Sequence, residues 1–158
     1  MRRDGRLSAA LHLLLHLERS EVPMTSAALS KVMDTNPVVI RRMLAGIRDA
    51  GYVRSDKGHG GGWTLACEMS QLSLRDIYDA LGRPTVFAVG HRKESPDCLV
   101  EQAVNASLTA ALDEAEAVLL ARFADVSLDQ IASDVQKRLR ARKTQQRRRQ
   151  GTGGCGHV

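Results

Sequence analysis

Residues 36–65 read NPVVIRRMLAGIRDAGYVRSDKGHGGGWTL, in which a basic, amphipathic segment is followed by a glycine-rich loop. Asn36 is a favourable helix N-cap, and Pro37 suits the first helical position because its missing N–H would be unpaired there. Apolar residues recur on one helical face while arginines lie off it. The apolar positions are Val39, Ile40, Met43, Leu44 and Ile47, and the arginines are Arg41, Arg42 and Arg48. We therefore predict a helix with a packing face and a basic face, ended by Gly51.

After Gly51 the chain changes from helix to hairpin. Tyr52 and Val53 are an apolar pair too short for another helix, and a second apolar run follows at residues 63–65. Between them, residues 57–62 contain four glycines, which leave the backbone too free to hold a helix. The order of short strand, glycine-rich basic loop and short strand predicts a small β-hairpin, or wing.

A short helix is predicted upstream, over residues 24–33, and only residues 34–36 separate it from the next helix. A short helix, a tight turn and a second helix with basic outer residues form a helix-turn-helix, whose second helix enters the DNA major groove. The hairpin that follows makes the motif winged. In the upstream helix, Thr25 is the expected N-cap, and the apolar side is expected to be Ala28, Leu29 and Val32.

Residues 48–65 carry a pattern that resembles the Rrf2 family of winged-helix transcription regulators. The hallmark of that family is RxxGLVxSxxGxxGG[YW]xL, and this chain reads RDAGYVRSDKGHGGGWTL. Tyr52 replaces the usual leucine, and His59 stands where proline is frequent. The resemblance implies a DNA-binding regulator that dimerises through a long C-terminal helix.

The whole chain is predicted to be mainly α-helical with a small β-hairpin. A first core helix is expected around residues 9–17, and a helix capped by Ser73 is expected to run through Leu81. We divide the chain into four parts. These are a winged helix-turn-helix domain over residues 1–82, a linker over 83–97, dimerisation helices over 98–134, and a basic, disordered tail over 135–158.

The first dimerisation helix, from Cys98 to Phe123, carries an apolar stripe at heptad-like spacing. The stripe is Val104, Leu108, Ala111, Ala115 and Val118, with Leu112 and Leu119 beside it. Such a stripe packs either on its own domain or against the same helix of a second copy, and we favour the homodimer. Two-fold DNA readers bind half-sites about 34 Å apart, roughly one helical turn. A second, short helix is expected from Ser127 to Val135.

Charge is unevenly distributed along the 158 residues. The net charge is +5, yet residues 135–158 hold eight Lys or Arg and no acid, so the rest of the chain is net acidic. Within that rest, residues 36–62 hold five Lys or Arg against two Asp. Positive charge is thus concentrated where the second helix and the wing lie, as a phosphate-facing surface requires. The tail is either a helical extension turning into disorder or a non-specific DNA arm.

The DNA-contacting residues are predicted from their place in the motif. Residues at the start of a recognition helix reach base edges, and Arg41 or Arg42 could bind a guanine through two guanidinium N–H groups. Val38 is expected to point outward, whereas Val39 fits either face. The wing tip suits phosphate or minor-groove contact, and the start of the upstream helix suits phosphate oxygens. The candidates are Thr25, Ser26, Asn36, Val38, Val39, Arg41, Arg42, Lys57, Gly58, His59 and Gly60.

A sensing group is harder to identify. Relatives in the resembled family hold an iron–sulfur cluster on three cysteines before the long helix, spaced CxxxxxCxxxxxC. This chain keeps the last, Cys98, and has Val86 and Arg92 at the other two spacings. A cluster needs about four protein ligands, so no cofactor is predicted. Cys98 is either a redox sensor or a plain buried cysteine. Its place at a helix N-terminus favours the reactive thiolate, whereas the negative charges of Asp97 and Glu101 beside it oppose thiolate formation.

Other chemistry is not expected. His12 and His16 have the i, i+4 spacing that can chelate a metal, but histidines on an apolar helix are more often packing residues, so no metal is predicted. Cys67 is expected to be structural, and no role is assigned to Cys155. The GHGGG loop lacks the GxSxG partner of esterases and does not lie between a strand and a helix, so the chain is predicted not to be an enzyme.

The predicted partners are double-stranded DNA and a second copy of the chain. No apolar run reaches the roughly 20 residues of a membrane helix, and the apolar start of the chain is interrupted by histidines, unlike a signal peptide. The three cysteines are widely spaced, which does not suggest a disulfide framework. We expect a cytoplasmic repressor. The alternative is a winged-helix module that binds protein rather than DNA, which the basic face disfavours.

Overall fold

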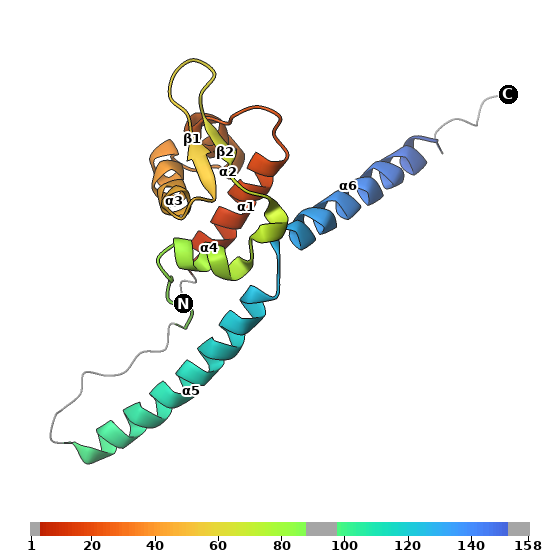
Figure 1. Cartoon of the computed structure of the whole chain (residues 1–158). Coiled ribbons are helices and arrows are strands. Elements are labelled where there is room, and N and C mark those ends of the chain that lie inside the picture. Colours follow the sequence, from red (N-terminus) through yellow and green to blue (C-terminus); the bar gives the residue numbers. More distant parts are fainter. Residues whose placement is uncertain (1–3, 88–97, 152–158) are drawn as a thin grey trace.

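The computed structural model describes residues 4–87 and 98–151, with side chains through residue 145. It is mainly helical with a two-stranded antiparallel sheet, which confirms the predicted fold class. Figure 1 shows a compact head, with two long helices leaving it in different directions. The elements are α1 (Arg6–Glu18), α2 (Ser26–Met33), α3 (Pro37–Asp49), β1 (Val53–Ser55), β2 (Trp63–Leu65), the 3₁₀-helix η1 (Met69–Gln71), α4 (Leu74–Ala80), α5 (Leu99–Ala124) and α6 (Leu128–Gly151).

The helices of the head begin at the predicted caps. The hydroxyl of Thr25 accepts the Ala28 N–H at 3.1 Å at the start of α2, and the amide oxygen of Asn36 accepts the Val38 N–H at 2.8 Å at the start of α3. These bonds satisfy backbone donors that have no partner inside the helix. Gly51, at φ +84°, ends α3 in the left-handed conformation that glycine favours.

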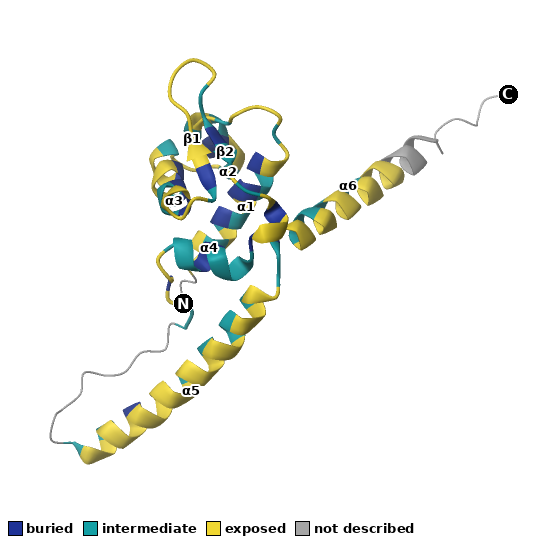
Figure 2. Cartoon of the chain, in the orientation of Figure 1, coloured by how far each residue is buried: buried dark blue, intermediate teal, exposed yellow. Residues whose placement is uncertain are grey.

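The core lies where α1 to α4 and the sheet meet, and Figure 2 shows the buried residues gathered there. It is built mainly from aliphatic side chains, because the chain holds only five aromatic residues, of which Trp63 and Tyr78 are buried. Leu128, the first residue of α6, is also fully buried in this core. The fully buried set includes Ala10, Leu13, Leu14, Leu29, Leu44, Ile47, Ile77 and Leu128.

Val32, predicted on a packing face, and Val39, for which the sequence allowed either face, are both exposed. Val39 retains 46% of its surface because the buried stripe of α3 is centred on Ile40, one residue and about 100° away on a helix. Val32 is exposed on α2, where Ser30 is buried. The Ser30 hydroxyl can be buried because it donates to the Ala27 carbonyl at 2.9 Å.

The long helix α5 matches its predicted bounds within one residue at each end. Its C-terminal half contacts α4, but most of its apolar stripe faces outward. Val104 retains 51% of its surface, Leu108 41% and Val118 73%. Within the described residues, none of the helices is both long and apolar enough to cross a lipid bilayer.

Helix α6 runs to Gly151, well beyond Val135, where the sequence predicted the last helix to end; the basic tail continues it as a helical extension, one of its two predicted forms, rather than becoming disordered at residue 135. The difference has a local cause. Residues 136–150 are mostly Lys, Arg, Gln, Leu and Ala, which favour helix, and neither Gly nor Pro interrupts them before Gly151. Arg138 also pairs with Asp134 one turn earlier, at 2.6 Å. Residues 152–158 and the linker residues 88–97 lie outside the described part of the chain.

Candidate nucleic-acid interface

The wing is joined to the helix-turn-helix by a third backbone segment. β1 and β2 pair in antiparallel register, with Ser55 opposite Trp63. On the other edge of β2, the Trp63 N–H donates to the Met24 carbonyl at 2.8 Å, and the Met24 N–H donates to the Trp63 carbonyl at 3.0 Å. The sequence did not predict this pairing, because a bridge of one residue has no alternating pattern to reveal it.

Side chains reinforce this connection. The indole Nε1 of Trp63 donates to the hydroxyl oxygen of Ser26 at 2.9 Å, at the first residue of α2. Gly62 lies so close to Met24 that an added Cβ would stand 2.8 Å from its backbone carbonyl. Gly61 is equally confined by the Asp56 carbonyl, 2.3 Å from a built Cβ. The Gly-Gly-Trp sequence therefore fixes the wing against the start of α2.

A concave surface of about 270 Å³ lies between α2, α3 and the wing. It brings together four of the predicted contact residues from three separate elements, which are Thr25, Ser26, Arg41 and Gly58. The Arg41 side chain is exposed and forms no ion pair with any described residue. We call this surface the wing groove; its remaining lining residues are Ser55, Asp56, Gly61, Gly62 and Trp63.

The hydroxyls of Thr25 and Ser26, at one end of the wing groove, can still donate a hydrogen bond. Ser26 accepts from Trp63, and Thr25 accepts from the Ala28 N–H, so each hydroxyl still carries its own O–H. Both lie at the N-terminus of α2, where unpaired N–H groups and the helix dipole favour an anion. This end of the groove is suited to a phosphate oxygen.

The structure separates Arg42 from Arg41. Arg42 lines a second cavity of about 190 Å³ on the opposite flank of α3, together with Val39 and Arg6. Val38, with 49% of its surface exposed, lies one turn before Arg42 on the outward face of α3. Asn36 uses its amide oxygen as the helix cap, which leaves its NH₂ group as a donor. The start of α3 thus presents apolar and donor groups side by side.

The tip of the wing, residues 57–60, is exposed. Lys57 and His59 alternate with Gly58 and Gly60, whose φ angles are +100° and +78°. Glycine is required at both positions because side chains rarely adopt this left-handed conformation. Sequence reasoning missed Arg54, whose Nε donates to Thr64 Oγ1 at 3.0 Å across the two strands. This bond holds a further cation on the outer surface of the wing.

Comparison with known proteins agrees with this geometry. The sequence profile of the Rrf2 family, described as an iron-dependent transcriptional regulator, matches residues 4–134. The chain belongs to the Rrf2 family. It is therefore a winged-helix transcriptional regulator and not an enzyme, as the sequence predicted.

Individual relatives of this Rrf2 protein cover most of its length. YffB of Lactococcus lactis subsp. lactis (strain IL1403), named as a candidate HTH-type transcriptional regulator, is 30% identical over 115 residues, which are 72% of this chain and 74% of that one. YwnA of Bacillus subtilis (strain 168), named likewise, is 25% identical over 128 residues, covering 81% and 95%. A crystal structure of a candidate transcriptional regulator from Lactobacillus plantarum has a TM-score of 0.69 at 22% identity, covering 94% and 98%.

The family's description names iron, and the donor groups that could bind it among the described residues are few. His12 and His16 face each other with 3.1 Å between their Nε2 atoms, and burial lowers the pKa of His16, helped by the charges of His12 and Arg19. Within residues 4–87 and 98–151, no group of three or more His, Cys, Asp or Glu side chains could hold a metal ion. The donor groups in the described part of the chain therefore do not fit an iron centre.

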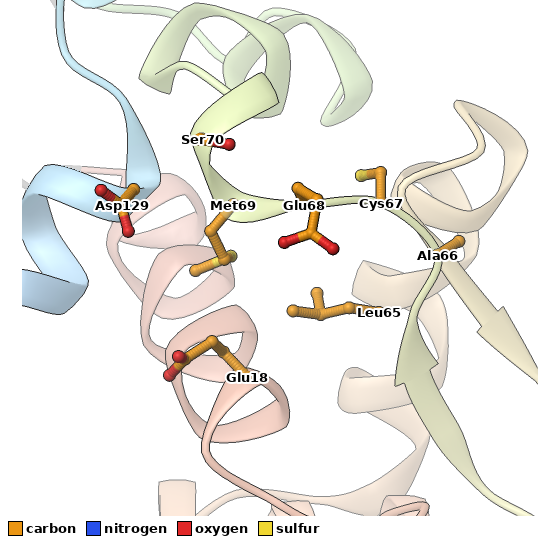
Figure 3. A pocket seen from close by; sticks show the side chains of 8 residues that line it. All are labelled: Glu18, Leu65, Ala66, Cys67, Glu68, Met69, Ser70 and Asp129. Atoms are coloured by element: carbon orange, nitrogen blue, oxygen red, sulfur yellow. The ribbon is translucent and has the colours of Figure 1, made fainter.

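The two described cysteines differ in their surroundings. Cys98 is the half-buried N-cap residue of α5, and its thiol makes no capping hydrogen bond. Cys67 donates weakly to the Tyr52 carbonyl at 3.8 Å and lines a polar cavity of about 500 Å³ beside Glu68 (Figure 3). Burial raises the pKa of the Cys67 thiol, and the Glu68 carboxylate raises it further. Both effects disfavour the thiolate, which is the reactive form of a cysteine.

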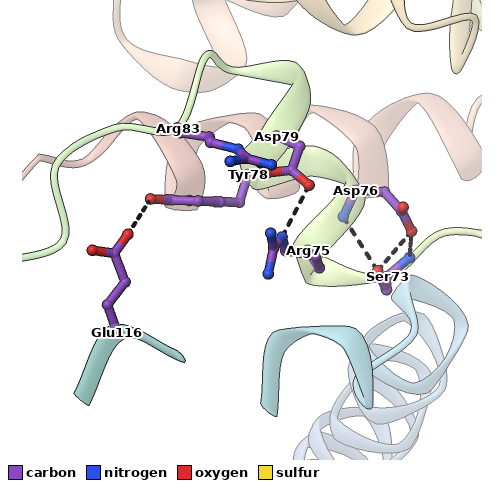
Figure 4. Close-up of polar contacts among 7 residues, drawn as sticks. All are labelled: Ser73, Arg75, Asp76, Tyr78, Asp79, Arg83 and Glu116. Atoms are coloured by element: carbon purple, nitrogen blue, oxygen red, sulfur yellow. Dashed lines mark hydrogen bonds and ion pairs between the residues drawn. The ribbon is translucent and has the colours of Figure 1, made fainter. Parts of the chain in front are cut away.

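A polar cluster joins α5 to the head (Figure 4). The Tyr78 hydroxyl donates to Glu116 of α5 at 3.2 Å, and the Tyr78 ring meets Phe123 edge-on with 6.1 Å between centroids. Beside them, Asp79 accepts from Arg75 at 2.9 Å and from Arg83 at 2.8 Å. Burial opposes ionisation of Asp79, but these two hydrogen bonds outweigh it and lower its pKa. The head and α5 are therefore coupled through α4.

Proposed function

We propose that this Rrf2 protein is a sequence-specific DNA-binding regulator that acts in the cytoplasm as a homodimeric repressor. The observation that carries the proposal is the wing groove, in which Thr25, Ser26 and Arg41 converge with the backbone of the wing. Phosphate-binding hydroxyls, an unpaired guanidinium and a close-approach glycine loop are the parts that a winged reader of duplex DNA needs.

In the proposed complex, the N-terminal half of α3 enters the major groove. Arg41 and Arg42 bind base edges, and Val38 and Val39 contact apolar groups such as a thymine methyl. The Asn36 amide donates to a base or a phosphate. The wing reaches the adjacent backbone or minor groove through Lys57 and His59, while Gly58 and Gly60 let the chain approach closely. Thr25 and Ser26 donate to phosphate oxygens at the start of α2.

The second copy is proposed to pair through α5. The exposed stripe of Val104, Leu108 and Val118 is a continuous apolar surface on a long helix, which a soluble chain buries against a partner. Two heads related by a two-fold axis would read half-sites about 34 Å apart, roughly one DNA turn. Cys98 lies at the start of the same helix, so its oxidation would alter the surroundings of the dimer contact.

One observation favours a second function. Val32, Val38 and Val39 are all exposed on α2 and α3, and an apolar surface of this kind also suits a protein partner. Salt dependence separates the two functions. Phosphate binding by the head gives a log K against log salt slope of about −0.9 per phosphate contact, and Arg41→Gln should reduce its magnitude; for a head that binds protein, Arg41→Gln should leave the slope on duplex DNA unchanged.

A further inference from the structure

Helix α6 is anchored to the head at its first residues. The Leu74 N–H donates to the Val126 carbonyl at 2.9 Å, and the Leu128 N–H donates to the Leu72 carbonyl at 2.8 Å. Leu128 itself is fully buried, and the start of α6 contacts η1 and α1. The direction of the helix is therefore set by the head, and its 24 residues extend about 36 Å at 1.5 Å per residue.

Beyond this anchor the helix is strongly basic. Residues 135–158 contain no Asp or Glu. Arg138 is paired with Asp134, but the four other described cations of this segment form no ion pair with any described residue. All of them are exposed, and their spacing distributes them around the helix rather than along one face. These four are Lys137, Arg140, Arg142 and Lys143.

The charge pattern indicates which partner fits. After Leu139 the described part of α6 has no large apolar residue, so it has no apolar face to enter a lipid surface or a coiled coil. Uniform positive charge without apolar anchors suits a polyanion bound through its phosphates. The same chain carries a proposed DNA-reading head, which would hold duplex DNA at high local concentration near α6. Duplex DNA is therefore favoured over an acidic protein.

We propose that α6 is a second, sequence-independent DNA-binding element, which contacts duplex phosphates through Arg140, Arg142, Lys143 and their basic neighbours. The inference rests on the proposed function of the head. In the view of Figure 1, α6 leaves the head on the side away from α3. The phosphates that α6 contacts therefore belong either to the flank of the duplex that α3 reads or to a second duplex, and the chemistry of the contact is the same for both.

The test compares two variants of the full chain with equal loss of charge. Arg142→Gln/Lys143→Gln removes two cations of α6 and keeps a helix-favouring residue at each place. Arg19→Gln/Arg122→Gln removes two exposed cations elsewhere and serves as the control. Circular dichroism establishes that both variants are folded. The magnitude of the salt slope of duplex binding should fall by about two for each α6 that contacts the duplex, at about 0.9 per lost contact, and stay unchanged for the control.

The duplexes distinguish the source of the phosphates. A greater affinity for a long duplex than for a minimal one, lost in the α6 variant, assigns the contact to the flank. Capture of a second labelled duplex, lost in the same variant, assigns it to a separate segment. Equal slopes for both variants on every duplex would overturn the inference. If the parent chain selects no sequence, the proposed function of the head is overturned. The contact of α6 with DNA can then still be measured on a duplex of random sequence.

Discussion

The indole nitrogen of Trp63 lies 2.9 Å from the hydroxyl oxygen of Ser26, and this bond ties the base of the wing to the first residue of α2. The two residues are far apart in sequence. Together with the backbone bridge between Trp63 and Met24, they set the position of the wing relative to α2 and thus the shape of the wing groove. A groove of fixed shape lets arginine and wing contacts form together.

The coupling between Trp63 and Ser26 can be measured in a double-mutant cycle. We expect Trp63→Phe and Ser26→Ala each to lower the free energy of unfolding, with a coupling of about 1 kcal/mol for the shared hydrogen bond. Urea denaturation of the four proteins gives the value. Strictly additive effects would show that the bond contributes nothing to the attachment of the wing.

Gly62 should not tolerate a side chain. An added Cβ would meet the Met24 backbone at 2.8 Å, so we expect Gly62→Ala to lower the free energy of unfolding by about 1–3 kcal/mol, as overpacking does. Gly5→Ala is the control, because nothing lies within 4 Å of its built Cβ, and it should lose less than about 1 kcal/mol. Equal losses in the two variants would contradict the close approach of Gly62 to Met24.

Arg41 and Arg42 should determine specific DNA binding. We expect Arg41→Ala/Arg42→Ala to abolish binding to a selected duplex while leaving the dimer intact, with each arginine contributing about 1–3 kcal/mol of discrimination. Arg48→Ala is the control on the same helix, since Arg48 lies in the last turn of α3 and pairs with Asp49 at 2.8 Å. Fluorescence anisotropy on the selected and a scrambled duplex provides the measurement. If the double variant and Arg48→Ala bind the selected duplex with equal affinity, Arg41 and Arg42 do not read its bases.

The apolar stripe of α5 should hold the two copies together. Leu108→Arg places a charge in the stripe, and we expect it to shift the protein from dimer to monomer, because an unpaired charge at a contact is costly to bury. Ala106→Arg is the control, since it lies on the opposite, exposed face of α5. Sedimentation equilibrium reports both masses. A dimer that persists in Leu108→Arg would place the interface elsewhere.

Cys98 should account for any response to oxidant. We expect the parent and Cys67→Ser to change their DNA footprint under oxidant, and Cys98→Ser to lose that change. Burial and Glu68 raise the pKa of Cys67, so at neutral pH its thiolate fraction is below that of an ordinary cysteine. If Cys98→Ser responds as the parent does, Cys98 is not the sensor.

Local signals in the sequence were sufficient to predict much of this structure. Thr25 and Asn36 were identified as caps because capping depends on residues within one turn, and the wing followed from its glycines and the apolar runs on either side. What could not be predicted depends on tertiary contacts. The Met24 to Trp63 bridge leaves no periodic signal, and whether Val39 is buried depends on where the neighbouring helices lie.

The candidate site was only partly predictable for the same reason. Arg41 and Arg42 are adjacent in sequence and equivalent by composition, yet the fold places them in different cavities on opposite flanks of α3. The basic tail was interpreted mainly from its charge. Its residues also have a high helix propensity, and the chain is helical through Gly151. Residue identity thus indicated which chemistry is present, and the fold determines which groups act together.

Selection of bound duplexes from a randomised library tests the central claim most directly. We expect enrichment of a two-fold symmetric sequence with half-sites separated by about one DNA turn, roughly 34 Å, because two α3 helices read it from one dimer. Recovery of no enriched sequence after repeated rounds, or of a motif without two-fold symmetry, would contradict it.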